Sequence, residues 1–257
     1  MGQHFLVDGF VLEKIINGAG ISKNDLVIEI GPGIGAMTQA LAKKAGHVIA
    51  VELDKTLIPL LNDTFANEPV TIVCGDILKT DINALIQQFS HFNFKAAANL
   101  PYYITTPVIF YLLESGIKFD TITVMVQKEV AKRMAAVPGS KDYGSLTLAI
   151  QYYADVSLVA NVPVNCFMPR PGVDSAVVNL KILQQPRLAV NKEFLFKIIK
   201  AAFGKRRKTL VNCLDGFGFN KHETEKKLLA AGINPSSRGE TLNIYDFERI
   251  AKMFLLV

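Results

Sequence analysis

Short apolar runs recur through the first 183 residues, and amphipathic segments separate them. The runs predict strands at 26–30, 48–51, 70–73, 94–98 and 122–126. Helical spacing follows the first two runs, at about 36–44 and 57–65. Because strands that alternate with helices favour right-handed crossovers, we expect an α/β fold with a mostly parallel, doubly wound sheet.

Later segments extend this pattern. Thr105 or Thr106 is expected to cap a helix whose first turn contains Pro107. Two further apolar runs, 156–162 and 176–182, predict two more strands. The segment between them, PVNCFMPRPG, is rich in proline, so we expect a long hairpin-like connection.

The pattern changes after the Gln184-Gln185-Pro186 break. Four segments have helical periodicity and no strand stands out: KEFLFKIIKAAF, KTLVNCL, KHETEKKLLAAG and YDFERIAKMFLLV. We therefore divide the chain into an α/β domain at 1–183 and a small all-helical domain at 184–257.

Charge is distributed unevenly between these two parts. Residues 1–183 contain 14 Lys and Arg against 16 Asp and Glu, whereas residues 184–257 contain 14 against 7. A near-neutral first part and a basic second part favour a polyanionic partner. A solvated basic surface would have the same composition, so charge alone does not choose between the two.

Composition indicates a soluble protein of a reducing compartment. There is no uncharged apolar run of 18 residues and no signal-peptide pattern, so we expect a cytoplasmic protein without membrane contact. Cys74, Cys166 and Cys213 show no CxxC spacing and are interpreted as reduced core thiols. No metal-ligand spacing links the histidines, and we predict no metal site.

The segment VIEIGPGIGAM leads from the first predicted strand into a helix. Gly31, Gly33 and Gly35 permit a tight turn and close approach of a ligand to the backbone. Read as GxGxxA, the same letters match a dinucleotide fingerprint. Glu29 disfavours a pyrophosphate there, and Pro32 removes one N–H that a phosphate would use. Both features favour S-adenosylmethionine (SAM), which carries a sulfonium and no phosphate.

Acidic residues also follow the next two predicted strands. Glu52, 21 residues after Gly31, is placed to accept both ribose hydroxyls of the cofactor. Asp76, in CGDI, is placed to accept from the adenine amine, and Ile77 is counted with it as a cofactor-binding residue. Ligands of this sheet class lie at the carboxyl ends of the strands, where these acids gather.

Asn99-Leu100-Pro101-Tyr102 follows the fourth predicted strand, beside the same crevice. Methylation of an adenine amine requires acceptors for its two N–H bonds, and the Asn99 side chain and the Leu100 carbonyl can supply them. Pro101 stiffens the turn, and Tyr102 offers a ring on which a flipped base can stack. Since the proton becomes acidic after transfer, alignment and electrostatics are expected to carry the rate without a strong general base. Taken alone, an Asn-Pro turn beside a core tyrosine would fit the same letters.

These motifs resemble those of the KsgA-type small-subunit ribosomal RNA adenine dimethyltransferases, over nearly the whole chain. The matching blocks are GQHFLVD, IEIGPGIGAMT, NLPYYIT, VQKEVAKRM, YGSLTLAIQYYADV, CFMPRPGVDSAVV and FGKRRKTLVNCL. The resemblance implies a Rossmann-like class I SAM-dependent methyltransferase. It also implies that Gln3, His4 and Leu6 join the cofactor pocket and that Phe167 is a second aromatic partner of the base.

By the same resemblance, the acceptor is a pair of adjacent adenines in the 3′-terminal hairpin loop of small-subunit (16S) rRNA, each methylated twice. The partner is then the 30S particle, and we expect a monomer. The family usually has a few basic residues before the GQ motif, where this sequence has Met1, so we expect weaker RNA affinity with unchanged chemistry.

A basic cluster in FGKRRKTL is the expected RNA contact: Lys205, Arg206, Arg207 and Lys208. Lys128, Lys132 and Arg133 also have helical spacing, but for them a solvated helix face is the preferred interpretation.

Three alternatives remain at this point. The related Erm type modifies large-subunit rRNA and shares an NLPY-like loop, although the blocks at 143–156 and 203–214 look like the KsgA type. A non-catalytic rRNA-binding assembly factor could keep the fold, but the glycine loop and Asn99 are intact here. An NAD-dependent oxidoreductase leaves the NLPY segment and the basic domain unexplained.

Overall fold

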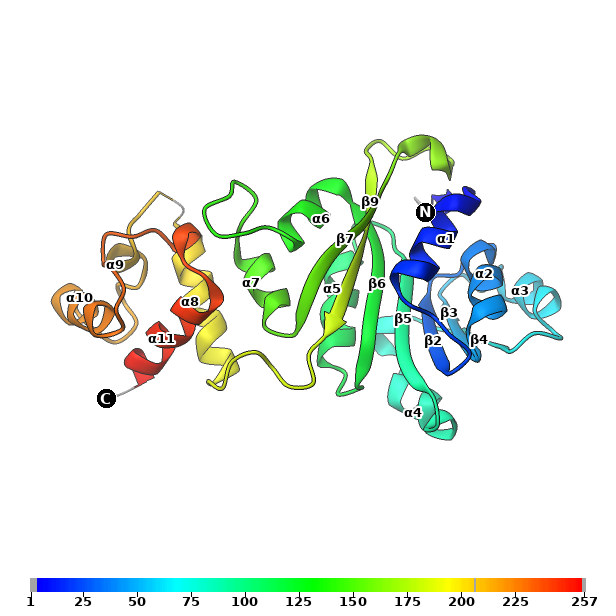
Figure 1. Ribbon diagram of the computed structural model, residues 1–257, viewed down its shortest axis with the longest axis horizontal. Coiled ribbons are helices and arrows are strands. Elements are labelled where there is room, and N and C mark those ends of the chain that lie inside the picture. Colours follow the sequence, from blue (N-terminus) through cyan, green and yellow to red (C-terminus); the bar gives the residue numbers. More distant parts are fainter. Residues whose placement is uncertain (1–3, 206, 256–257) are drawn as a thin grey trace. The chain divides into compact units, whose positions relative to one another are not determined.

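The computed structural model describes residues 4–205 and 207–255 (Figure 1). They form two compact units, one comprising the chain up to Ala131 with Val156–Gln184, the other Lys132–Asp155 with Gln185 onward. The second junction falls where the sequence predicted a boundary, but the structure differs for residues 132–155. Tyr143, Leu148 and Tyr152 are buried in the hydrophobic core of the helical unit, which groups this segment with the C-terminal helices.

A seven-stranded sheet forms the centre of the first unit, in the order β4-β3-β2-β5-β6-β9-β7. Its strands are β2 (Asp25–Ile30), β3 (His47–Glu52), β4 (Val70–Cys74), β5 (Asn93–Asn99), β6 (Phe119–Gln127), β7 (Ala154–Val162) and β9 (Ser175–Ile182). The five neighbouring strands β4, β3, β2, β5 and β6 are parallel, whereas β9 pairs antiparallel with β6. All six residues of β2 are buried, including Asp25 and Glu29, and burial on both faces of the sheet explains why the other four are apolar.

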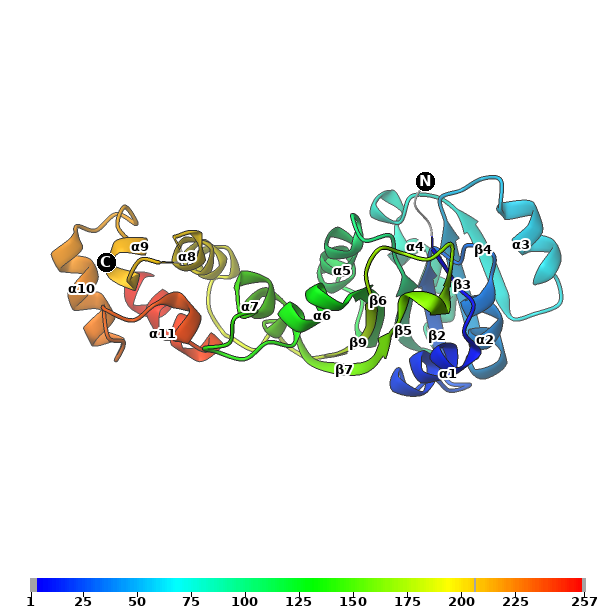
Figure 2. The ribbon, with the colours of Figure 1, turned by 90° about the horizontal axis from the view of Figure 1, so that it is seen from above.

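Helices cover both faces of this sheet. Those of the first unit are α1 (Gly9–Gly18), α2 (Ala36–Lys44), α3 (Ile58–Thr64), α4 (Ile82–Ile86) and α5 (Thr105–Glu114), with 3₁₀ turns η1 (Ile77–Lys79) and η2 (Gln87–Phe89). Seen from above, α1 and α2 lie on one face and α4 and α5 on the other (Figure 2). This arrangement confirms the doubly wound α/β class.

The expected cap of α5 was wrong. Ile104 occupies the N-cap position, and no side chain caps the helix. The hydroxyl of Thr105 donates instead to the carbonyl oxygen of Pro101, at 3.2 Å. Thr105 is therefore already inside the first turn and fastens the helix to the preceding loop.

A two-stranded sheet that the sequence did not predict joins β1 (Phe5–Leu6) to β8 (Phe167–Met168). The strands are antiparallel, with Leu6 opposite Phe167. The connection between β7 and β9 is thus more than a hairpin-like link, because it contains a 3₁₀ turn, η3 (Val164–Cys166), and then β8.

The second unit is helical. Helix α6 (Lys128–Met134) leads into it, followed by α7 (Ser145–Gln151), α8 (Lys192–Gly204), α9 (Leu210–Cys213), α10 (Lys221–Ala230), η4 (Gly239–Thr241) and α11 (Ile244–Leu255). The described residues after β9 contain no strand, which confirms the all-helical C-terminal part. Leu195, Ile198 and Phe247 are fully buried in its core.

The sequence predicted that all three cysteines lie in the core, and two of them do. Cys166 and Cys213 are buried, but Cys74 is exposed at the end of β4, an edge strand of the sheet. Across the described ranges, no group of three or more His, Cys, Asp or Glu side chains is suited to hold a metal ion. No helix in those ranges is long and apolar enough to cross a membrane.

Candidate active site

The loop between β2 and α2 places three glycines in the left-handed region. Gly31, Gly33 and Gly35 have φ of 70°, 58° and 88°. At Gly33, a Cβ atom would lie 2.8 Å from the ring of Phe5, so neither the backbone angle nor the space admits a side chain. The loop therefore depends on glycine for its conformation and for the approach of β1.

Two cavities adjoin this loop and share Gly31, Leu100 and Pro101 as lining residues. The first cavity is lined by His4, Phe5, Leu6, Glu29, Gly31, Pro32, Gly33, Ile34, Ala36, Met37, Asn99, Leu100, Pro101, Tyr102 and Phe167. The second cavity is lined by Ile30, Gly31, Val51, Glu52, Leu53, Asp54, Gly75, Asp76, Ile77, Leu100, Pro101, Tyr103, Ile104 and Val108. Both lie at the carboxyl ends of parallel strands.

Glu29 is a buried acid at the first cavity. It is fully buried, and neither carboxyl oxygen has a hydrogen-bond partner among the described residues. Burial is the main cause that raises the pKa of Glu29 to about 8, and the charge of Glu52 also raises it. The nearby hydroxyl of Thr38 opposes this rise in part, although its geometry is not that of a hydrogen bond. A buried carboxyl without partners fits a cationic group that enters the cavity, such as the ammonium of SAM.

Glu52 and Asp76 lie at the second cavity, and each already accepts a hydrogen bond. The backbone N–H of Gly33 donates to Oε2 of Glu52 at 2.9 Å, and that of Asp54 donates to Oε1 at 2.8 Å. Asp76 caps η1 by accepting from the N–H of Leu78 at 3.1 Å. Glu52 thus braces the glycine loop, a role that the sequence did not predict.

The Asn99–Tyr102 segment lies where the two cavities meet. The side-chain Nδ2 of Asn99 donates to the backbone oxygen of His4, at 3.2 Å. With Nδ2 engaged in this way, the carboxamide oxygen remains as an acceptor. The phenol oxygen of Tyr102 lies 3.1 Å from the hydroxyl of Ser175.

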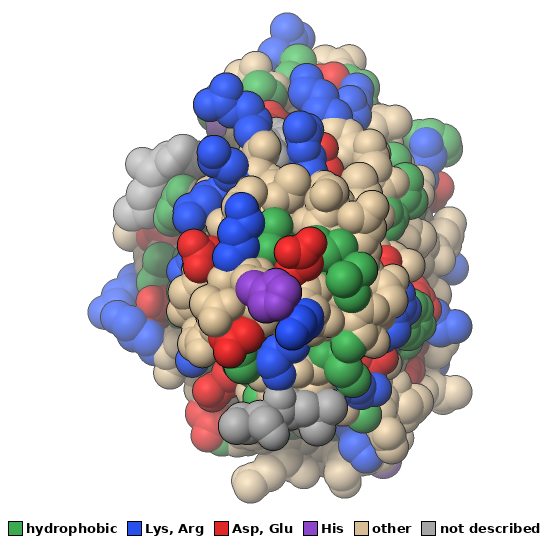
Figure 3. All heavy atoms as spheres, turned by 90° about the vertical axis from the view of Figure 1, so that its left-hand side faces the viewer, with side chains coloured by type: hydrophobic (Ala, Val, Ile, Leu, Met, Phe, Trp, Pro, Cys, Tyr) green, Lys and Arg blue, Asp and Glu red, His purple; other side chains and the backbone are tan. Residues whose placement is uncertain are grey.

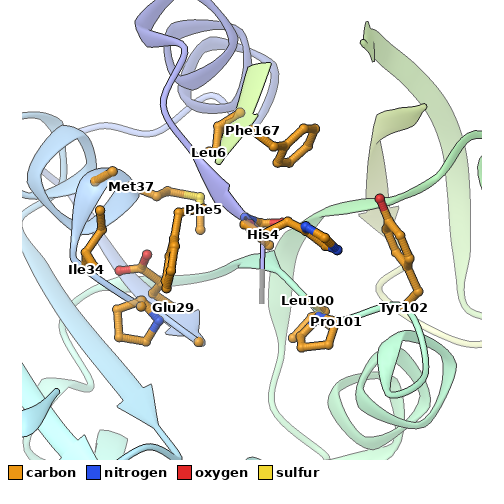
Figure 4. Close-up of a pocket in the computed structure, with 15 residues that line it drawn as sticks. His4, Phe5, Leu6, Glu29, Ile34, Met37, Leu100, Pro101, Tyr102 and Phe167 are labelled. Atoms are coloured by element: carbon orange, nitrogen blue, oxygen red, sulfur yellow. Dashed lines mark hydrogen bonds between the residues drawn. The ribbon is translucent and has the colours of Figure 1, made fainter. Parts of the chain in front are cut away.

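Three ring side chains, His4, Tyr102 and Phe167, gather on one side of the first cavity. Figure 4 shows His4 between Phe167 and Tyr102, and Glu29, Ile34 and Met37 on the opposite side. The His4 ring stacks against Tyr102 with centroids 6.3 Å apart. Its Nδ1 lies 2.8 Å from the carbonyl oxygen of Pro169, so this nitrogen donates. We call the side with His4, Tyr102 and Phe167 the aromatic half and the side with Glu29, where the Phe5 ring also lies, the acidic half.

Most of the predicted cofactor residues that the structure describes line these cavities, but Gly35 does not. Gly35 is the N-cap of α2 and packs against Phe65 instead. Gln3 lies outside the described residues. Phe5, Leu53 and Tyr103 line the cavities but were not predicted. The only available signal was their position beside a motif residue.

The basic cluster lies in the helical unit, in the turn between α8 and α9. Lys205, Arg207 and Lys208 are exposed, and Arg206 lies outside the described residues. The buried thiol of Cys213 lies 3.7 Å and 3.8 Å from the carbonyl oxygens of Lys205 and Lys208. Figure 3 shows Lys and Arg side chains at several places on the visible face of the molecule, with acidic side chains among them.

Three features together define a Rossmann-like, class I SAM-dependent methyltransferase with an added helical C-terminal part. They are the glycine loop, the acidic residues at the carboxyl ends of the strands, and the doubly wound sheet. A family described as "Ribosomal RNA adenine dimethylase" matches residues 1–255. The chain belongs to this family and is an enzyme of the rRNA adenine dimethyltransferase type.

Relatives and solved structures agree with this family. The chain is 52% identical to "Ribosomal RNA small subunit methyltransferase A" of Lachnoclostridium phytofermentans, over 97% of this chain and 89% of the relative. It is 46% identical to the protein of the same name from Clostridioides difficile, over 98% and 89%. A dimethyladenosine transferase from Plasmodium falciparum has a TM-score of 0.85 at 28% identity, covering 98% of this chain and 97% of that one. The 23S rRNA methyltransferase ErmE has a TM-score of 0.76 at 23% identity, covering 97% of this chain and 99% of that one, and supports the fold alone.

Proposed function

We propose that this protein transfers methyl groups from SAM to the 6-amino groups of two adjacent adenines in the 3′-terminal hairpin loop of small-subunit (16S) rRNA, giving dimethyladenines. The observation that carries the proposal is the meeting of Asn99–Tyr102 with the glycine loop, Glu29 and Phe167 around one cavity. The names of the relatives at 46–52% identity support the small subunit over the Erm-type acceptor.

The cofactor is assigned to both cavities. Glu29 faces the ammonium group, the main chain of Gly31 and Gly33 borders the methionine part, and Glu52 accepts from the ribose. Asp76 and Ile77 line the part of the second cavity assigned to adenine. His4 and Leu6 border the first cavity, and Gln3 is assigned to the same pocket by family resemblance alone. Bound there, SAM supplies a methyl carbon that forms a bond to the amine nitrogen as its bond to sulfur breaks.

The target base is assigned to the aromatic half of the first cavity. Tyr102 and Phe167 provide rings for stacking of a flipped adenine. The carboxamide oxygen of Asn99 and the carbonyl oxygen of Leu100 accept the two N–H bonds of the amine, which directs its lone pair toward the methyl carbon. The proton released after transfer passes to solvent, so no buried general base is required.

RNA binding is assigned to Lys205, Arg206, Arg207 and Lys208. Three of these side chains are described, and all three are exposed. Exposed Lys and Arg contact phosphates without reading bases. The acceptor is the rRNA within the 30S particle, the enzyme acts as a monomer, and its compartment is the cytoplasm, where small subunits are assembled.

One methyl-transfer assay tests the proposal. Purified enzyme and labelled SAM are incubated with 30S and, separately, with 50S particles that lack the modification, and modified bases are then mapped. We expect label in two adjacent adenines of the 30S rRNA. Label in 50S rRNA alone would support the Erm-type activity and contradict the proposal.

A further inference from the structure

Two consecutive residues, Asp174 and Ser175, contact the segments that carry Tyr102 and Phe167, two of the ring side chains of the first cavity. Ser175 lies 3.1 Å from the phenol oxygen of Tyr102 through its hydroxyl. Asp174 accepts from the backbone N–H of Val164 at 3.3 Å, and Val164 begins the turn that leads into Phe167. Neither residue lines the cavity itself.

Ser175 is a firm support because its backbone belongs to the central sheet. It is 1% exposed and begins β9, where it pairs with Gln127 of β6. A buried hydroxyl requires a partner, and the side-chain partner of Ser175 here is Tyr102. The contact therefore joins a ring on a loop to a strand that cannot shift without breaking the sheet.

Asp174 fastens the other aromatic segment at both of its ends. Its carboxylate accepts from Val164 at the start of the 163–174 connection. At the end of that connection, its backbone oxygen accepts from the N–H of Lys128 at 3.0 Å, and its Oδ2 lies 3.7 Å from Nζ of Lys128. Phe167 lies between these two ends and pairs with Leu6 through β8.

We propose that Asp174 and Ser175 are positioning residues for the target base: Ser175 orients the Tyr102 ring, and Asp174 holds the segment that presents Phe167. This inference rests on the proposed function. A base held between two rings at a defined angle keeps its amine in line with the methyl carbon, and small misplacement lowers the rate steeply. The cofactor is assigned to the other side of the cavity, so its affinity does not depend on these contacts.

The first test is a double-mutant cycle with Ser175→Ala and Tyr102→Phe. Both variants keep the aromatic ring and remove one oxygen of the contact. Loss of one hydrogen bond predicts that each single variant lowers kcat/KM for 30S methylation by about five- to tenfold. The double variant is expected to be no worse than the worse single one, because both remove the same interaction. The dissociation constant for SAM should stay within about twofold of the wild type.

Asn179→Ala is the control for general destabilisation. Asn179 lies on the same strand, is 5% exposed, and donates to the Gly18 carbonyl and the Thr123 hydroxyl, far from the aromatic residues along the strand. This variant should lower the melting temperature at least as much as Ser175→Ala while leaving kcat/KM unchanged at a temperature where both are folded.

The second test compares two changes at Asp174. Asp174→Asn keeps a side-chain oxygen for the Val164 N–H and should retain most of the activity. Asp174→Ala removes that acceptor and should lower kcat by about fivefold, again with unchanged SAM affinity. Rescue by the conservative variant would distinguish positioning of the backbone from the ion pair with Lys128.

The outcomes separate the two proposals. Absence of methyl transfer by the wild type overturns the proposed function and this inference together. Transfer by the wild type with an unchanged Ser175→Ala variant, or a double variant whose loss equals the product of the two single losses, overturns this inference alone. Loss of SAM affinity in step with loss of rate also overturns it.

Discussion

Single side chains of the first cavity already have defined orientations. Asn99 has its amide nitrogen bound to the His4 backbone oxygen, and Tyr102 has its phenol bound to Ser175. Glu29 is the exception, because its carboxyl oxygens have no partner among the described residues. At this scale the cavity has oriented amide and phenol groups on one side and a carboxyl without a partner on the other, which is what the proposed binding of base and cofactor requires.

Replacement of Asn99 by alanine should remove nearly all methyl transfer. The variant loses the acceptor assigned to the target amine, and loss of one such group costs about 100-fold or more in kcat. Labelled methyl incorporation into 30S particles measures the rate, and equilibrium dialysis with SAM measures binding, which we expect to be retained. Asn93→Ala, at the opposite end of β5, is the matched control. A rate equal to that of the wild type would remove Asn99 from the mechanism.

Glu29 should make folding stability depend on pH. Its pKa is raised from 4.5 to about 8 by burial, so between these values the folded protein retains a proton that the unfolded chain releases. The contribution of this residue to the free energy of unfolding therefore falls as pH rises from 4.5 to 8, by on the order of a few kcal/mol.

Glu29→Gln tests this expectation, since glutamine stays neutral at every pH. Urea unfolding of the cofactor-free proteins at about pH 5 and about pH 9, on either side of the titration, should show the wild type losing stability relative to the variant. At the higher pH, where the wild-type carboxyl is ionised, the same variant should bind SAM more weakly than the wild type does. Parallel stability profiles of the two proteins would contradict the assignment of a raised pKa.

Short elements at the site depend on contacts with each other more than on their own propensities. The strand β1 has two residues and is held by β8, and the ring of Phe5 on β1 packs over Gly33. The glycine loop is held by the Glu52 carboxylate, which accepts a hydrogen bond from the backbone N–H of Gly33. A change in any one of these elements should therefore alter the shape of the cavities assigned to the cofactor.

Gly33→Ala should remove most cofactor affinity. The new methyl group meets the Phe5 ring at 2.8 Å and the backbone has φ of 58°, so the loop, β1 or the Phe5 ring must shift. Gly116→Ala is the control, because Gly116 has φ of 79° and a Cβ atom added there would meet no neighbouring atom within 4 Å. Both variants should lose roughly 1 kcal/mol of stability from backbone strain. Isothermal titration with SAM should show a loss of at least about tenfold only for Gly33→Ala; an equal effect of both changes would contradict the role of Phe5.

The part of the chain after residue 183 differs from the rest in charge as well as in architecture. Lys and Arg exceed Asp and Glu by seven after residue 183, whereas the rest of the chain has an excess of two acids. Among the described residues of the second unit, some cations are paired, such as Arg187 with Asp155 and Arg249 with Asp246. The turn at 205–208 is the densest basic cluster and is exposed where it is described.

Neutralisation of this turn should weaken RNA binding without changing the chemistry. The triple variant K205Q/R207Q/K208Q should bind 30S particles with a salt dependence reduced by about three phosphate contacts, and kcat at saturating 30S should stay near the wild-type value. The control K43Q/K55Q/K118Q makes the same change in net charge at exposed positions of the first unit. Binding of 30S particles measured at several salt concentrations tests this prediction. Equal slopes of log binding constant against log salt concentration for the two triple variants would contradict a specific RNA contact at 205–208.

Much of this protein could be predicted from local pattern. Alternating apolar runs and helical segments placed the parallel strands and α2, since burial on both faces of a sheet leaves a periodic signal in the sequence. The glycine loop and the NLPY segment predicted a candidate site, and both line the same cavity, because unusual backbone and chemistry require particular residue types. Family resemblance added Phe167 and the N-terminal residues. The predicted cap at Thr105 or Thr106 was wrong, and residues 132–155 belong to the helical unit, because caps and domain limits depend on tertiary contacts.

Only the tertiary structure decided which distant residues meet. Asn99 contacts His4 across 95 residues of sequence, and Tyr102 contacts Ser175 across 73. Residues 132–155 joined the helical core, although the chain returns to the sheet after them. The physical reason is the same in each case: periodicity reports whether a residue is buried, but the partner it is buried against depends on how the whole chain folds.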